Sequence, residues 1–163
     1  LLELMYATAL RIAEVLSLTT DDVNLADKSL FVTGKGLKDR IVPIGDWVIP
    51  WLMEYMESGR PKLITSPTNI LFLSYTGGPL FESNVCWIIK KYANKCGVQK
   101  TSPHGFRHAC ATHMLKGGAD IRYIQELLGH SNLSTTQIYT KVDISSLKKV
   151  HKQFHPRERT DAI

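Results

Sequence analysis

The chain has 163 residues, enough for one domain with a substantial core, since typical domains contain about 100–150 residues. Its 44% hydrophobic content argues against wholesale disorder, and its net charge of +5 mildly favours an anionic partner. The apolar stretch 1–18 is interrupted by Glu3, Arg11 and Glu14, so it predicts neither a membrane span nor a signal peptide. Three cysteines at irregular spacing give no disulfide framework, which favours a reducing, cytoplasmic compartment.

Helical periodicity dominates the sequence, with capping residues, Gly or Pro at the expected boundaries. In chain order, we expect helices at 1–16, after Thr19 or Thr20, at 46–58, at 83–96, from Ser102-Pro103, at 120–128, from Ser134, and at 144–150. The apolar side of the 46–58 helix is expected to carry Trp47, Trp51, Leu52 and Tyr55. The ending HKQFHPRERTDAI is expected to be loosely ordered, with 157–163 outside a domain that spans 1–156.

Two β-rich runs, 29–33 and 40–44, flank the sequence GKGLKD and predict an antiparallel hairpin. Pro43, near the end of the second run, suits an edge strand. Residues 70–74 predict another short extended piece, which a Thr-Gly-Gly-Pro turn follows. The fold class is therefore α+β, mainly helical, with a small antiparallel sheet.

The C-terminal third presents polar side chains from helix ends. His104 and Arg107 lie three residues apart just inside the helix that Ser102 caps, so both leave from one face. His130 follows the Gly that ends the 120–128 helix, and Tyr139 lies on the short helix after it. Because helix N-termini offer free backbone donors to phosphate, this arrangement favours a phosphate site with a nucleophile.

The sequence HGFRHACATHMLKGGADIRYIQELLGHSNLSTTQIY closely resembles the catalytic core of the tyrosine recombinases, the phage-integrase and Xer-type family. That family has H-x-x-R, then L-G-H about two dozen residues on, then the nucleophilic tyrosine nine residues later. His104, Arg107, His130 and Tyr139 match these positions. The resemblance covers 1–156, implies the catalytic-core fold of that family, and is strongest to Xer-type members.

The sequence TALRIAE resembles the family motif T-G-L-R-x-x-E, in which the arginine binds the scissile phosphate. The resemblance implies that role for Arg11, and implies that Glu14 steadies it. Ala9 stands where the family usually has Gly. Considered alone, Arg11 reads as a solvated helix charge, although its apolar neighbours favour partial burial with partners.

The hairpin sequence GKGLKDRIVP is similar to the family pattern G-K-G-x-K-x-R-x-V-P. The resemblance implies that Lys35 is the general acid that protonates the 5′-oxygen leaving group, with Lys38 as an alternative. Arg40 is expected to contact a DNA phosphate. Considered alone, a basic glycine turn is usually only a turn, and this one lacks the spacing of a phosphate-binding Walker loop.

These residues would permit cleavage of a phosphodiester by Tyr139, giving a 3′-phosphotyrosyl link and a free 5′-hydroxyl. Arg11 and Arg107 would relieve charge on the non-bridging oxygens, with no metal or cofactor required. His130 would donate a further hydrogen bond, while His104 would either donate one or accept the tyrosine proton. A zinc site at His104, His108, Cys110 and His113 is disfavoured, because no zinc-ligand motif is present.

The resemblance further implies that an N-terminal core-binding domain precedes this chain, and that four protomers act on two DNA duplexes. The segment after Tyr139, roughly 144–154, is expected to dock on a neighbouring protomer. Two other functions stay open: a DNA-binding module that performs no chemistry, and a type IB topoisomerase. The complete set of six catalytic positions argues against the first, and the LGHSNLSTTQIY run argues against the second.

Overall fold

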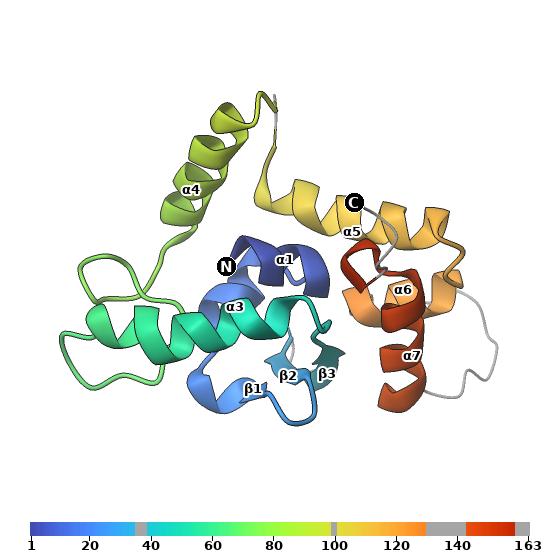
Figure 1. The fold of residues 1–163 in the computed structure, drawn as a ribbon, viewed down its shortest axis with the longest axis horizontal. Coiled ribbons are helices and arrows are strands. Elements are labelled where there is room, and N and C mark those ends of the chain that lie inside the picture. Colours follow the sequence, from blue (N-terminus) through green and yellow to red (C-terminus); the bar gives the residue numbers. More distant parts are fainter. Residues whose placement is uncertain (35–38, 99–100, 130–142, 159–163) are drawn as a thin grey trace.

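The computed structural model of the chain describes residues 1–34, 39–98, 101–129 and 143–158, to which the structural statements below refer. Helices surround a small sheet, and one of them extends away from the body (Figure 1). The helices are α1 (Leu2–Thr8), α2 (Ile12–Ser17), α3 (Val48–Glu54), α4 (Glu82–Lys95), α5 (Pro103–Lys116), α6 (Ile121–Leu128) and α7 (Ile144–Phe154). Among these described residues, no helix is long and apolar enough to cross a membrane.

The predicted hairpin is confirmed, and a short strand extends it into an antiparallel sheet of order β1-β2-β3. The strands are β1 (Val23–Asn24), β2 (Ser29–Thr33) and β3 (Asp39–Pro43). Leu30 pairs with Val42, and both are buried, whereas the exposed Phe31 and Ile41 face the other side. Pro43 ends an edge strand, as predicted, because an edge strand has one unpaired side, on which the missing N–H of proline costs no ladder hydrogen bond.

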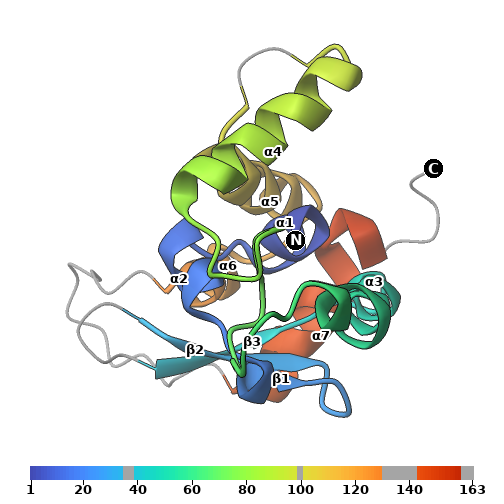
Figure 2. The same ribbon diagram turned by 90° about the vertical axis from the view of Figure 1, so that its left-hand side faces the viewer.

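The core lies between the sheet and the helices, with α1 near its centre and packed against α5. Figures 1 and 2 show α4 projecting from this body, which agrees with its burial of only Val85 and Ile89. Bridges from Ile70 to Thr19 and from Leu73 to Pro79 confirm the predicted extended piece. Helix α4 therefore contributes little to the hydrophobic core.

The prediction of one helix over 1–16 was wrong, because the chain breaks between α1 and α2. Ala9 has the left-handed angles φ 50° and ψ 27°, and Arg11 is extended at φ −68° and ψ 149°. Apolar spacing continues on both sides of the break, so periodicity could not reveal it. The left-handed conformation explains why glycine is usual at this position in the family that the motif resembles. As a result, Arg11 lies at the N-terminus of α2.

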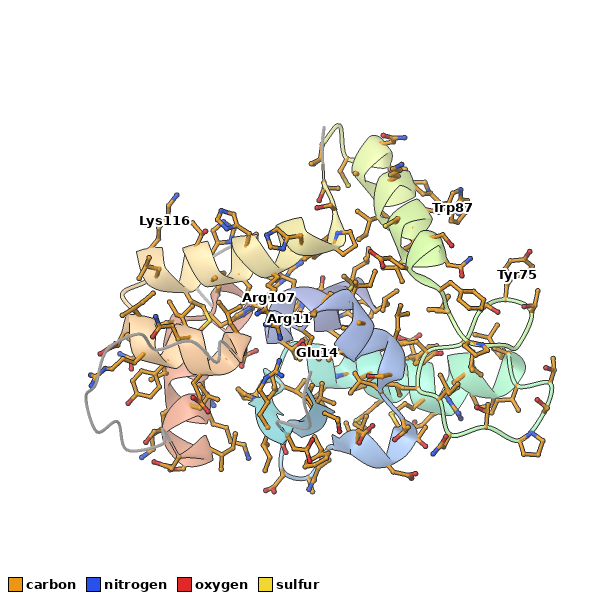
Figure 3. All side chains as sticks on the ribbon, turned by 180° about the vertical axis from the view of Figure 1, so that it is seen from behind. Arg11, Glu14, Tyr75, Trp87, Arg107 and Lys116 are labelled. Atoms are coloured by element: carbon orange, nitrogen blue, oxygen red, sulfur yellow. The ribbon has the colours of Figure 1, made fainter. Side chains whose placement is uncertain are left out.

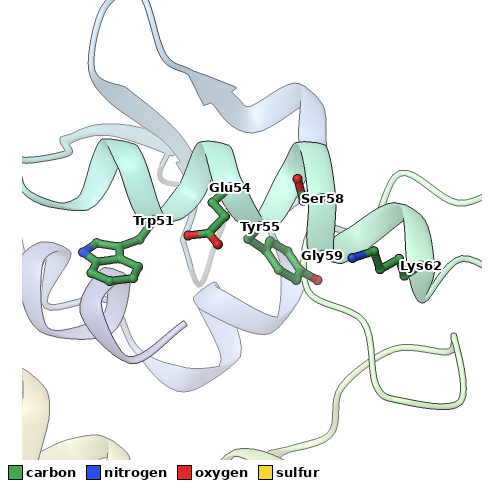
Figure 4. A pocket seen from close by; sticks show the side chains of 6 residues that line it. All are labelled: Trp51, Glu54, Tyr55, Ser58, Gly59 and Lys62. Carbon is green, nitrogen blue, oxygen red and sulfur yellow. The ribbon is translucent and has the colours of Figure 1, made fainter.

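The helix after Trp47 was predicted correctly, but only half of its apolar side was: Leu52 is buried and Tyr55 packs against the core as predicted, whereas the two tryptophans do not. Val48 and Leu52 are buried, whereas the side chains predicted beside Leu52, Trp47 and Trp51, are 39% and 55% exposed. The helix continues beyond its predicted end at 58, because a π-helical turn over Tyr55–Gly59 leads directly into a 3-10 turn over Arg60–Lys62. Its exposed side carries a shallow hollow lined by Trp51, Glu54, Tyr55, Ser58, Gly59 and Lys62 (Figure 4).

The prediction of a loose ending was wrong for residues 151–158, and residues 159–163 lie outside the described residues. Helix α7 reaches Phe154, and a 3-10 turn over Pro156–Glu158 follows it. His151 and His155 are fully buried, and Glu158 accepts hydrogen bonds from the backbone N–H groups of Asp46 and Trp47. The polar sequence of this segment did not predict this packing. The side chains bind backbone groups of other segments, and a sequence pattern does not show such contacts.

The predicted starts of α5 and α6 are confirmed by their caps. Ser102 accepts a hydrogen bond from the Gly105 N–H, and Asp120 accepts one from the Arg122 N–H.

Replacing Ser102 by alanine should lower the free energy of unfolding by about 1 kcal/mol, because a helix N–H loses its acceptor. Urea unfolding measures the change. Ser83→Ala, in the exposed first turn of α4, is the matched control and should alter stability by only a few tenths of a kcal/mol. Equal changes in both variants would contradict the capping role.

Candidate active site

Arg107 joins three helices through its buried guanidinium. Its Nη1 donates to the carbonyl oxygen of Ala9 and its Nη2 to that of Leu128, both at 2.6 Å. These carbonyls lie at the C-terminal ends of α1 and α6, where unpaired backbone oxygens concentrate partial negative charge. A cation on α5 thus fixes the ends of two other helices.

Glu14 is a buried carboxylate that four N–H donors surround. Its Oε1 accepts from Nη1 of Arg11 at 3.0 Å and from Nη1 of Arg40 at 2.9 Å. Its Oε2 accepts from Nη2 of Arg40 at 3.0 Å and from the backbone N–H of Arg11 at 2.8 Å. Burial by itself raises the pKa of Glu14, but these hydrogen bonds and the two positive charges outweigh burial and leave the pKa below its ordinary value. Glu14 is therefore ionised at neutral pH.

Arg11 is the most accessible member of this group, although its apolar neighbours had favoured partial burial. Its side chain is 45% exposed, and Nη1 makes an ion pair with Glu14. Because Arg11 precedes the first turn of α2, the break after α1 directs it out of the core. Its guanidinium is held on one side by Glu14, while the other side remains accessible to a ligand.

Together these side chains form a compact cationic cluster, defined as Arg11, Glu14, Arg40 and Arg107. Figure 3 shows Arg11, Glu14 and Arg107 close together where α5 passes the break between α1 and α2. Burial, followed by the charge of Arg11, lowers the pKa of Arg107 to about 10, which still leaves Arg107 charged at neutral pH. Three positive charges and one negative charge leave a net charge of +2, which suits a phosphate group.

The structure describes only some of the remaining predicted site residues. His104 is exposed in the first turn of α5, one turn before Arg107. Lys35, Lys38, His130 and Tyr139 lie outside the described residues. For the zinc alternative, Cys110 is buried with its pKa raised to about 12, whereas His104, His108 and His113 are exposed. Within the described part of the chain, no three His, Cys, Asp or Glu side chains form a group that could hold a metal ion.

Arg40 was expected to contact a DNA phosphate, and its contacts with Glu14 were not predicted. Its side chain is 12% exposed, and both of its Nη groups bind Glu14. The signal was present in strand alternation: Arg40 precedes Val42 by two residues, so it lies on the buried face of β3.

The sequence matches the phage integrase family over residues 1–145. It is 48% identical over 159 residues to tyrosine recombinase XerD of Staphylococcus epidermidis, and 47% identical over the same length to the protein of that name from Staphylococcus aureus. Each alignment covers 96% of this chain and 54% of the relative. The chain thus spans about half the length of the curated relatives it matches.

Solved structures give the same result for the fold. The XerA recombinase superposes with a TM-score of 0.74 at 33% identity, covering 93% of this chain and 55% of that one. The XerH recombinase bound to its difH substrate gives 0.72 at 27% identity, covering 93% and 44%. The fold is therefore the catalytic-domain fold of the tyrosine recombinases, and the predicted fold class is confirmed. The chain belongs to the phage integrase family.

Proposed function

We propose that the chain is the catalytic domain of a site-specific DNA recombinase that breaks and rejoins strands through a 3′-phosphotyrosine intermediate. Its role would be DNA integration and excision or the resolution of chromosome dimers. The cationic cluster is the observation that carries this proposal, because it combines an accessible Arg11 with an ionised Glu14 and a charged Arg107. The H-x-x-R, L-G-H and tyrosine motifs supply the remaining residues.

In the proposed reaction, the Tyr139 oxygen attacks the phosphorus as the bond from phosphorus to the 5′-oxygen breaks. Lys35, or Lys38 in its place, gives a proton to that oxygen, and the tyrosine proton passes to His104 or to solvent. The charge of Arg11 and Arg107, with a hydrogen bond from His130, stabilises the non-bridging oxygens. One phosphoester replaces another, so the bond energy is kept for rejoining.

Neither a metal ion nor an external energy source is part of this mechanism. Guanidinium groups bind two phosphate oxygens in a fixed fork and supply the charge relief that metal pairs give in nucleases. A cytoplasmic protein acting on double-stranded DNA fits the mechanism. XerH has been solved with its difH substrate in pre-cleavage and post-cleavage complexes, which supports DNA as the partner of this chain.

The complete protein is proposed to contain a core-binding domain before this chain and to act as a homotetramer. In the single chain, α7 packs against its own β3, α5 and α6. Docking of residues 144–154 on a neighbour would use the outer face of α7, or would exchange these contacts for those of another protomer.

Replacing Tyr139 by phenylalanine should abolish covalent attachment to DNA. A nicked duplex that loses a short fragment on cleavage traps the attack, and a denaturing gel in EDTA displays the adduct. An adduct from the wild type and none from Tyr139→Phe is the expected result. DNA binding without an adduct would instead favour the binding module, and relaxation of supercoils by protein acting alone at one site would favour the topoisomerase.

A further inference from the structure

Arg40 occupies a central position in the cationic cluster. It is opposite Val32 in the β2–β3 ladder, and directly opposed residues share one face of the sheet. Val32 is buried, so this face is turned toward the core, and the Arg40 side chain is 12% exposed. The guanidinium is therefore nearly enclosed before any ligand binds.

Arg40 donates two hydrogen bonds to the carboxylate of Glu14. Its Nη1 and Nη2 reach one carboxylate oxygen each, at 2.9 and 3.0 Å, in the parallel fork that gives the most specific pairing of arginine with a carboxylate. The oxygen that accepts from Nη1 of Arg40 also accepts from Nη1 of Arg11. Since the two-point contact fixes the plane of the carboxylate, it also fixes the direction in which Glu14 holds Arg11.

Arg40 also lies against the end of α6. Gly129 has φ +62°, and a Cβ added there would be 2.9 Å from Cζ and 3.0 Å from Nε and Nη1 of Arg40. A larger residue at this position would have to displace the guanidinium that binds Glu14, and the left-handed angle of Gly129 also favours glycine. Gly129 directly precedes the segment of sequence that contains His130 and Tyr139. Arg40 thus lies against both Glu14, which holds Arg11, and Gly129, after which that segment begins.

We propose that Arg40 is a positioning residue that orients Arg11 through Glu14 and sets the end of α6, instead of a ligand of the DNA phosphate. The inference rests on the proposed recombinase function, because Arg11 matters here as the group that meets the scissile phosphate. Nε of Arg40 is buried and has no hydrogen-bond partner among the described residues. Because this nitrogen is a donor that a phosphate would satisfy, contact between Arg40 and the DNA phosphate must be tested directly.

The test is a double-mutant cycle of Arg40→Met and Glu14→Gln with the nicked duplex. DNA affinity and its salt dependence are measured separately from the rate of adduct formation at saturating DNA. Each single variant should slow cleavage by about 100-fold, as expected for a misplaced catalytic group, while DNA affinity changes less than about threefold. The double variant should be no slower than either single one, because both substitutions remove the same support.

A pH profile provides a readout that a general loss of stability would not move. In the wild type, hydrogen bonds and charge from Arg40 and Arg11 keep Glu14 ionised. Without Arg40, burial of Glu14 is poorly compensated and its pKa rises. Cleavage by Arg40→Met should therefore fall as the pH drops toward 5, relative to wild type, and Arg40→Lys should recover part of the rate.

Arg157→Met is the matched control, because it removes one positive charge at a surface pair with Glu3. It should leave cleavage and its pH profile unchanged. A phosphate ligand would behave differently: Arg40→Met would weaken DNA binding and reduce the salt slope by about 1, and Glu14→Gln would not. That result would overturn the proposal, as would a loss of stability in Arg40→Met with cleavage and its pH profile unchanged.

A further measurement separates this proposal from the proposed function. If the wild type forms no adduct, the recombinase assignment fails, but ¹⁵N relaxation at Arg11 Nε still reports how firmly the guanidinium is held in the DNA-free protein. Arg40→Met should lower the order parameter of Arg11 relative to wild type and to Arg157→Met. An unchanged order parameter would overturn the positioning role.

Discussion

Replacing Arg107 by methionine is expected to lower the free energy of unfolding by about 3 kcal/mol or more. The substitution leaves the carbonyl oxygens of Ala9 and Leu128 without the donors that hold them at 2.6 Å. It also removes the cation that connects α5 to the ends of α1 and α6. If the proposed function is correct, cleavage by the folded fraction should fall by about 100-fold or more as well.

Urea unfolding and the nicked-duplex assay measure the two effects separately. Arg107→Lys should be intermediate in stability, because an ammonium keeps the charge but lacks the planar fork that reaches two separated carbonyls. Lys116→Met, at the exposed far end of α5 (Figure 3), is the control and should change stability by no more than about 0.5 kcal/mol. Similar midpoints for Arg107→Met and Lys116→Met would show that the two carbonyl contacts contribute little.

The second large expected effect is loss of stability in mild acid, which originates in two buried histidines. The His151 and His155 rings stack with centroids 4.6 Å apart, and Nε2 of His151 donates to the carbonyl oxygen of Ala7 at 2.8 Å. Burial lowers the pKa of His151, and burial followed by the charge of His151 lowers the pKa of His155 to about 3. The His155 ring is therefore neutral in the folded protein well below pH 6, and burial makes His151 harder to protonate than an ordinary histidine.

The charged groups around the pair do not reverse this direction. Glu158 and Asp46 favour a protonated His151, while Arg157 and His113 disfavour a protonated His155. In the unfolded chain each histidine titrates near its ordinary pKa of about 6.5. The unfolded state thus binds more protons below that pH, and stability falls as the pH drops from about 6.5 toward the folded values.

At pH 5, the loss relative to pH 7 should be about 2 kcal/mol from His155 alone, with His151 adding to it. Urea unfolding between pH 7 and pH 5 measures it, above the range in which most carboxylates titrate. His155→Phe should flatten the dependence, whereas His108→Gln, at an exposed position on α5, should leave it unchanged. A wild-type stability that is constant over this range would contradict the assignment.

Short sequence patterns predicted the helix caps, helix ends and hairpin, because these features depend on residues that are close in the sequence. Ser102 and Asp120 cap their helices because the hydroxyl or carboxylate reaches the first turn of its own helix, and Gly129 ends α6 in the left-handed conformation that glycine favours. The hairpin was predicted from two β-rich runs on either side of the sequence GKGLKD, and β2 and β3 pair as antiparallel strands. These features depend on residues close in sequence, so their pattern is visible there.

The unpredicted features depend on partners far away in the chain. The break at Ala9 is stabilised by Arg107 from α5, and the burial of His151 depends on a carbonyl of α1. Trp47 was expected inside for its hydrophobicity, yet Val48 beside it took the buried position and Arg157 covers part of the indole. Whether such a residue is buried depends on its neighbours in space, and the periodicity of the sequence does not identify these neighbours.

Helix α1 has a consequence for how the protein is made. Its seven residues are too few to form a stable helix alone, and its last carbonyls depend on side chains from much later in the chain. Arg107, which binds Ala9, follows it by 98 residues, and His151 follows Ala7 by 144. During synthesis, α1 therefore leaves the ribosome before the other helices described here, yet it is among the last of them to be secured. Nascent chains that stop before α7 should expose the apolar face of α1 and depend on chaperones until the end of the chain is released.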